Sequence, residues 1–222
     1  MRDSITAEEK TMEQSFSRRG REILRCRIVY PHFSGPDFCP AVRRINRYCE
    51  ARIRAFRRYC GEVLYREAAA RFREEGGAEP FEAILRCGIG LNADCMLSLF
   101  FDRCAYTGAE RESRERFSGT WSLRSARRLR LGDCFIPGFQ YGIYARNQVE
   151  DTIARSIQSC PEEYFHDYVD RVEATFREEN FYLTPRGVLL YFQQYDLAPY
   201  PSGITVFRIS RTDPYVIWPG CR

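Results

Sequence analysis

Hydrophobic residues recur at steps of three and four through one long segment of the chain, residues 40–75. They are Val42, Ile45, Cys49, Ile53, Phe56, Cys60, Val63 and Phe72. This spacing places them on one face of a helix of about seven turns. We therefore predict a long helix with a buried stripe, ended by the glycine pair at 76–77.

Elsewhere apolar and polar residues alternate, which is the pattern of a half-buried strand. The predicted strands are residues 23–30, 81–89, 94–106, 116–129 (as a strand pair), 181–184, 188–195 and 204–210. The sequence TPRG at 184–187 suits a type I turn, so it joins two of these strands into a hairpin. The second arm of that hairpin is apolar on both faces, which predicts a central strand covered on both sides.

Shorter helical patterns lie in the C-terminal half. Val149 and Ile153 predict a helix over 141–159, and a further helix is predicted from Pro161 to about residue 176, with a helical turn at 131–135. The fold class is therefore α+β, a mostly antiparallel sheet with one long and two or three shorter helices packed on it. The predicted divisions are a flexible tail at 1–20, an N-terminal half at 21–130, a C-terminal domain at 131–215 and a tail at 216–222.

Composition narrows the class of protein. The chain has 222 residues, of which 44% are hydrophobic and 14% aromatic, so it can bury a core. Its charge is only +4, and Arg alternates with Glu in stretches such as 111–116, so we do not expect nucleic acid as a partner. The densest apolar run, 96–101, is too short to span a membrane, and residues 1–20 lack a signal-peptide core. We expect a cytoplasmic protein without a membrane span.

The residues that usually carry metal or catalytic chemistry are few or dispersed. The ten cysteines include no CxxC pair and the chain has two histidines, so we expect mostly reduced cysteines, no metal and no cofactor. GIGLNA at 88–93 resembles a dinucleotide fingerprint but lacks the helix that should follow, so its glycines are expected to serve a turn. His166 and Asp170 read as a surface pair. We do not expect an enzyme; a cysteine-dependent one, through Cys39 or Cys104, is the less favoured alternative.

The stretch FYLTPRGVLLYFQQYDLAPYPSG at 181–203 has Phe or Tyr at six of its 23 positions. The hairpin part is expected to be core. The segment 196–203 contains two prolines and cannot lie inside a sheet, and it holds Tyr200 rigidly between them. Tyrosine and arginine dominate binding hot spots. The candidate ligand-binding residues are therefore Tyr195, Pro199, Tyr200, Gly203 and Arg186.

Four stretches carry a resemblance to a known family. They are YPHFSG at 30–35, INRYCE at 45–50, LSLFFDRCAYTG at 97–108 and the whole of 181–203. In this order, within residues 23–210, the chain resembles the RsiV-like domain family, which includes the extracytoplasmic domain of a lysozyme-sensing anti-sigma factor and the accessory domain of a deacetylase. The most specific part is YFQQYDLAPYPSG, similar to the family's YFxxYEIAPYAxG.

The resemblance implies an RsiV-like α+β domain at 131–215 that binds a protein ligand and does no catalysis. The chain departs from the family at Tyr106–Arg111, where the family often has YTGGAHG, and it shows no anchor or signal of the usual kind. We expect a non-catalytic binding or sensor-type module for a protein or glycan-derived ligand, with a lysozyme-like protein as the ligand the family implies. The alternative is a cytoplasmic structural or regulatory partner protein without a small ligand.

Overall fold

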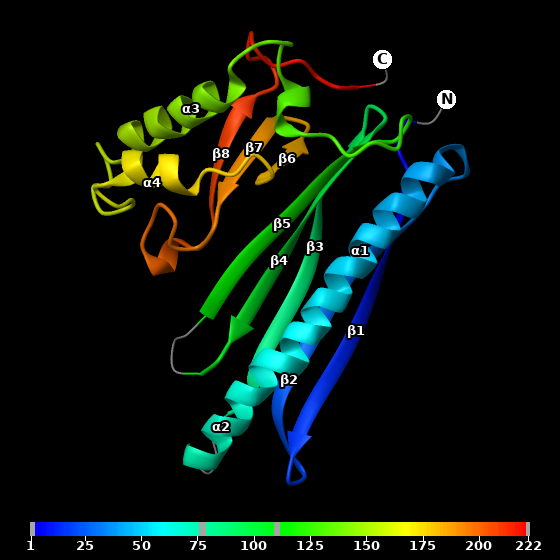
Figure 1. The fold of residues 1–222 in the computed structure, drawn as a ribbon, viewed down its shortest axis with the longest axis vertical. Coiled ribbons are helices and arrows are strands. Elements are labelled where there is room, and N and C mark those ends of the chain that lie inside the picture. The colour runs from blue at the N-terminus through cyan, green and yellow to red at the C-terminus, as the bar shows by residue number, and fades with distance from the viewer. Residues whose placement is uncertain (1–2, 76–78, 109–111, 221–222) are drawn as a thin grey trace. The chain divides into compact units, whose positions relative to one another are not determined.

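The computed structural model describes residues 3–75, 79–108 and 112–220, and these form eight strands in two sheets together with several helices (Figure 1). The first sheet has the order β1-β2-β3-β4-β5, and the second has the order β6-β7-β8. The α+β class predicted from the sequence is confirmed. The predicted helix end at 76–77 and most of the departing loop, residues 109–111, lie outside the described residues.

Two compact units make up the chain. The N-terminal unit consists of Ile5–Gly88 and Phe101–Glu115, and the C-terminal unit consists of the first residues, Ile89–Phe100 and the chain from Arg116 onward. The predicted division at residue 130 therefore differs from the one that the packing shows, because β3, β4 and β5 each contribute residues to both units.

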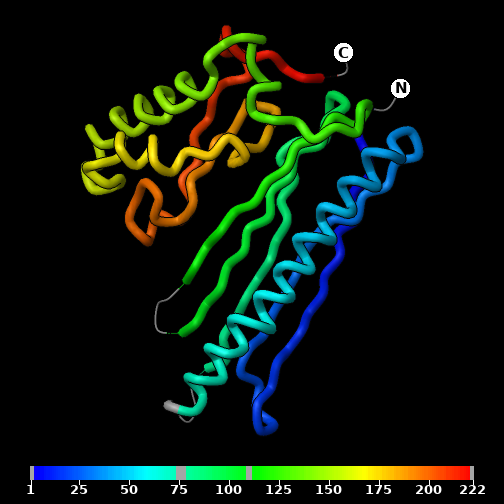
Figure 2. Tube along the Cα trace, viewed as in Figure 1, coloured from blue at the N-terminus to red at the C-terminus, as the bar shows by residue number. Residues whose placement is uncertain are grey.

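The N-terminal unit opens with the antiparallel hairpin of β1 (Thr6–Arg18) and β2 (Arg21–Ser34). Figure 2 shows the tight turn that joins the two strands. Arg19 and Gly20 both have positive φ, 51° and 77°, which is the geometry of a two-residue hairpin turn. The prediction of a flexible tail at 1–20 is wrong. The sequence of β1 has little apolar alternation, and nearly every one of its side chains is exposed. Its main-chain pairing with β2 holds the strand in place.

The predicted long helix is confirmed as α1 (Cys39–Tyr59), a π-helical turn (Cys60–Leu64) and α2 (Tyr65–Glu75). It connects β2 to β3 (Phe81–Ala93), which pair in parallel, and such a pair requires a long crossover. Figure 1 shows α1 running along the first strands of the sheet. The predicted stripe is buried from Val42 to Cys60. Val63 is instead 43% exposed and Leu64 is buried, because the wider π turn shifts the inward face by one residue.

The C-terminal unit carries the predicted hairpin, β6 (Phe181–Thr184) with β7 (Gly187–Phe192), and β8 (Thr205–Ser210) beyond it. Its helices are α3 (Tyr141–Ser156), which confirms the predicted helix, and α4 (Tyr168–Thr175). The second predicted helix is misplaced at its start, since it begins at Tyr168 and not at Pro161. Val149, Ile153 and Val172 from these helices are fully buried in one core with the sheet.

Buried hydroxyl groups connect the strands β4 (Met96–Tyr106) and β5 (Glu112–Ser122) to this unit. The Ser98 and Thr120 hydroxyl oxygens are 2.7 Å apart, and the Leu183 N–H donates to Ser98 Oγ at 2.7 Å. These contacts explain why the strand ends belong with the C-terminal sheet.

Gly90, within the dinucleotide-like run, lies inside β3 and not in a turn. A Cβ there would approach the Leu183 carbonyl oxygen to 2.4 Å, so glycine permits close backbone contact.

Residues 216–220, predicted as part of a tail, are held in the C-terminal unit. Val216 bridges to Phe135, the Ile217 N–H donates to the Cys134 carbonyl, and Trp218 Nε1 donates to Asp94 at 2.9 Å. No helix among residues 3–75, 79–108 and 112–220 has the length and hydropathy needed to cross a membrane.

Candidate functional site

The six aromatic residues of 181–203 divide into two groups. Four are buried in the C-terminal unit: Phe181, Tyr182, Tyr191 and Phe192. The other two, Tyr195 and Tyr200, are 58% and 40% exposed. The hairpin aromatics are therefore structural, as predicted, and the two exposed rings follow the end of β7.

The Tyr182 and Tyr191 rings contact the side chain of an arginine, Arg116. The guanidinium carbon of Arg116 on β5 lies 4.3 Å from the ring centroid of Phe100, 5.5 Å from Tyr182 and 5.8 Å from Tyr191. Arg116 Nη1 also donates to the Tyr182 hydroxyl at 3.3 Å. Cation–π contacts of this kind stabilise by about 0.5–2 kcal/mol, so these rings fasten β5 to the hairpin.

The first of the two glutamines after β7 also has a structural role. Gln193 Oε1 accepts the Arg116 N–H and Gln193 Nε2 donates to the Arg116 carbonyl, each at 2.8 Å. The side-chain amide thereby occupies the main-chain groups that an additional strand would use on β5, the last strand of its sheet. Blocking a sheet edge in this way opposes unwanted strand pairing.

The predicted ligand-binding residues fall in two places. Tyr195, Pro199, Tyr200 and Gly203 follow β7, where the buried Gly203 donates its N–H to the Tyr200 carbonyl at 3.3 Å. Arg186 lies in the turn before β7, and its carbonyl accepts the Arg211 N–H at 3.0 Å. The six residues of β7 separate the two places by roughly 20 Å, at ~3.3 Å per residue. Arg186 is thus apart from the other four residues.

Three residues that the sequence analysis did not select lie beside Tyr195. The Phe165 ring packs edge-on against the Tyr195 ring, with centroids 5.3 Å apart. The Arg171 guanidinium carbon lies 4.1 Å from the Phe165 ring centroid, and Arg171 Nε donates to Asp167 Oδ1 at 2.8 Å. We call Phe165, Asp167, Arg171 and Tyr195 the Tyr195 surface. Phe165 and Asp167 fall within the helix predicted from Pro161, whereas the observed helix α4 begins only at Tyr168, so no sequence pattern indicated that they lie near Tyr195.

The bend that presents Tyr195 is held by its neighbours. The Gln193 N–H donates to Asp196 Oδ2 at 2.7 Å, and Gln194 Nε2 donates to the Tyr200 carbonyl at 3.3 Å. Partial burial raises the pKa of Asp196, although the Gln193 N–H and nearby arginines act in the opposite direction. Tyr195 itself has a φ of 74°, a left-handed conformation that is rare for a bulky residue.

The residues considered for catalysis are His166, Asp170, Cys39 and Cys104. His166 is exposed and precedes α4, so it does not share a helix face with Asp170. Cys39 is exposed, and its thiol donates to the Pro36 carbonyl at 3.1 Å, whereas Cys104 is half-buried. No group of three potential metal ligands occurs within the described part of the chain.

The cysteines mostly behave as predicted. Eight are free thiols, and burial raises the pKa of Cys49 and Cys134 to about 12, which keeps them protonated. Cys95 is disulfide-bonded. Cys221 lies outside the described residues.

The region that contains the Tyr195 surface has known relatives. Residues 135–212 match the family model described as "Protein of unknown function (DUF3298)". This region is similar to the DUF3298 family. The match spans α3, α4 and the three-stranded sheet, and it lies within the C-terminal domain predicted at 131–215. The narrower likeness to RsiV stays a prediction.

Two solved structures of DUF3298 family proteins resemble nearly the whole chain. One, from Pseudomonas aeruginosa PAO1, has a TM-score of 0.64 at 16% identity and covers 97% of this chain and 96% of its own. Another, from Bacteroides fragilis, has a TM-score of 0.62 at 14% identity and covers 98% and 96%. At these identities the likeness concerns the fold alone. No curated protein matches the chain.

Proposed function

We propose that this chain is a non-catalytic binding module that recognises a protein or glycan-derived ligand through the Tyr195 surface, with Tyr200 beside it. The observation that carries the proposal is the state of Tyr195, which combines 58% exposure with a φ of 74°.

A left-handed backbone costs a non-glycine residue about 1–2 kcal/mol. A buried side chain can offset that cost by its packing, but more than half of Tyr195 faces solvent and its one close ring contact is edge-on with Phe165. Glycine or asparagine would make the same bend with less strain. Strain of this kind, borne by an exposed aromatic ring, is typical of residues retained for recognition.

The neighbours of Tyr195 suit the same role. Arg171 stacks on Phe165 and is held at its other edge by Asp167, so the cation and both rings are positioned before a ligand arrives. Preorganised aromatic and arginine side chains lose little entropy on binding and are enriched in hot spots. The sequence resemblance to the RsiV-like family, whose members include a domain that senses lysozyme, supports a protein as the ligand.

The test uses the full chain with Tyr195→Gly as the variant and Val206→Ala, an exposed residue on β8, as the matched control. Proteins captured by the wild type from the source cells are quantified against both variants. The partner so identified, hen lysozyme and oligomers of N-acetylglucosamine are then titrated directly by calorimetry.

We expect Tyr195→Gly to weaken binding by about tenfold or more, as at other hot spots, while its melting temperature stays equal to or above that of the wild type. Val206→Ala should leave both quantities unchanged. A lowered melting temperature with intact binding would instead make Tyr195 a structural residue and refute the proposal.

A further inference from the structure

A second feature of the C-terminal unit is a cleft of about 540 Å³ between the chain at 128–131 and the chain at 178–181. Gly119 and Thr120 of β5 also line it. Sites for small molecules usually measure about 300–1,000 Å³. None of the cleft residues belongs to the Tyr195 surface, so the cleft requires a separate explanation.

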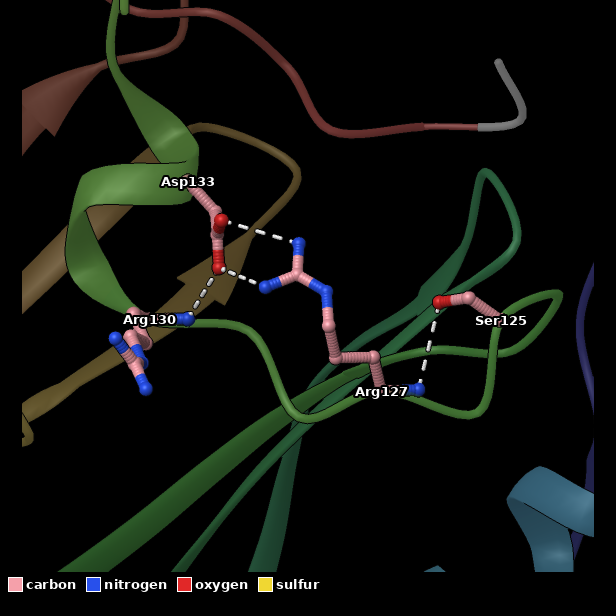
Figure 3. Close-up of polar contacts among 4 residues, drawn as sticks. All are labelled: Ser125, Arg127, Arg130 and Asp133. Atoms are coloured by element: carbon pink, nitrogen blue, oxygen red, sulfur yellow. Dashed lines mark hydrogen bonds and ion pairs between the residues drawn. The ribbon is translucent and has the colours of Figure 1, made fainter. Parts of the chain in front are cut away.

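The segment that contributes arginines to the cleft is held in a bend by an ion pair (Figure 3). Arg127 donates from both terminal nitrogens to the Asp133 carboxylate, at 2.9 and 3.0 Å, and the Arg130 N–H donates to the same carboxylate at 2.7 Å. Burial acts to raise the pKa of Asp133, but these hydrogen bonds outweigh it and hold the pKa below its usual value. The Arg130 guanidinium points away from Asp133 (Figure 3) and lines the cleft.

A second arginine of this segment is also positioned by internal contacts. Arg128 Nη2 donates to the Ser118 carbonyl at 2.8 Å, and its guanidinium carbon lies 5.9 Å from the Trp121 ring centroid. Trp121 can lie here because residue 119 is glycine, where a Cβ would come within 2.3 Å of the indole. The arginine segment is therefore held in place in the absence of a ligand.

The cleft lining also includes two carboxylates, those of Glu178 and Glu179. The Tyr141 hydroxyl donates to Glu178 Oε2 at 3.0 Å, and burial together with this hydrogen bond raises the pKa of Tyr141, so the phenol remains a donor. Tyr141 stacks on Phe135 with ring centroids 5.7 Å apart, which fixes the direction of the hydroxyl. One of the two carboxylates is thus oriented independently of the arginines.

We propose that this cleft binds a compact zwitterion, an amino acid or a short peptide with free ends. Its carboxylate faces Arg130, its ammonium faces Glu178, and its side chain lies along Leu129, Leu131 and Phe181, which complete the lining. Two arginines and two glutamates line the cleft, so an anion is repelled by the glutamates and a cation is repelled by the arginines. A ligand that carries both charges can pair with the arginines and the glutamates at once, and the occupied cleft then has no net charge.

The test titrates the full chain by calorimetry with the dipeptide Ala-Leu and two blocked forms. N-acetyl-Ala-Leu lacks the ammonium, and Ala-Leu amide lacks the carboxylate. Each block should weaken binding by about tenfold, the worth of one hydrogen bond between charged groups. Arg130→Gln should remove the preference for Ala-Leu over the amide, and Glu178→Gln should remove the preference over the acetylated form.

Matched controls separate this cleft from the rest of the molecule. Arg208→Gln and Glu162→Gln make the same changes at exposed positions outside the cleft and should keep both preferences, as should Tyr195→Gly. The proposal is overturned if Ala-Leu shows no binding up to about 10 mM, if the three probes bind equally, or if the cleft variants retain the wild-type preferences. Because Tyr195→Gly tests the Tyr195 surface and leaves the cleft intact, the two proposals fail independently.

Discussion

Gln193 offers the clearest test of how β5 is kept in place. In Gln193→Ala the Arg116 N–H and carbonyl lose their two partners, which the wild-type amide contacts at 2.8 Å each. Gln194→Ala is the matched control, because it removes the neighbouring amide, whose hydrogen bond to the Tyr200 carbonyl is longer at 3.3 Å.

The expected magnitude follows from those contacts. A hydrogen bond of this type contributes about 0.5–1.5 kcal/mol net, so losing two should lower the free energy of unfolding by about 1–3 kcal/mol. Gln193→Glu tests which of the two hydrogen bonds the side chain accepts and which it donates. Its carboxylate can still accept the Arg116 N–H but faces the Arg116 carbonyl, so folding should raise the pKa of the new carboxyl group. Stability is then present below pH ~4.3, where the group is protonated and can donate, and is lost as pH rises through the folded pKa.

Urea unfolding at neutral and acidic pH measures these differences, provided that the slope of the transition stays constant among the variants. Sedimentation velocity reports whether the uncovered edge of β5 causes self-association. The reasoning is refuted if Gln193→Ala lies within about 0.5 kcal/mol of the wild type, the range of an ordinary surface change. An equal loss for Gln194→Ala would refute it as well.

Three further expectations concern individual positions. Phe192→Ala should cost about 3–5 kcal/mol in urea unfolding, because Phe192 is 1% exposed, whereas Tyr200→Ala should stay within about 1 kcal/mol; equal losses would contradict the division of aromatics. Gly90→Ala should lower the melting temperature by several degrees, since the added Cβ would meet backbone at 2.4 Å; an unchanged value would show that β3 can move away. Burial, followed by a hydrogen bond to Asp213, raises the pKa of Tyr144 to about 12. The free energy of unfolding should therefore fall as pH rises from ~10 toward 12. Tyr144→Phe should remove one tyrosine that ionises at high pH from the ultraviolet titration.

Where a side-chain pattern repeated, the sequence alone was sufficient. The three-to-four spacing from Val42 to Cys60 defined the long helix, and apolar residues on both faces of 188–192 defined a central strand. In both cases burial of apolar area, the term that drives folding, follows directly from the local period of the element. The hairpin turn at 184–187 was likewise readable, because proline and glycine restrict the backbone locally.

Tertiary structure decided those features that depend on contacts between residues far apart in the sequence. Strand β1 has little apolar pattern and exists through its pairing with β2, so local composition suggested a tail. The role of Gln193 depends on Arg116, and that of Gly90 depends on Leu183, none of which is a neighbour in the chain.

The candidate site divides in the same way. The sequence indicated Tyr195 and Tyr200 as candidate binding residues, and both are exposed. It placed Tyr195 within the hairpin strand 188–195, whereas β7 ends at Phe192. It could not show that Phe165 lies against Tyr195 and Arg171 against Phe165, or that Arg186 sits at the far end of β7. A side chain's type and its element can be inferred from local periodicity, but which side chains meet is set by how the elements pack, because that packing satisfies hydrogen bonds and buries surface between segments far apart in the chain.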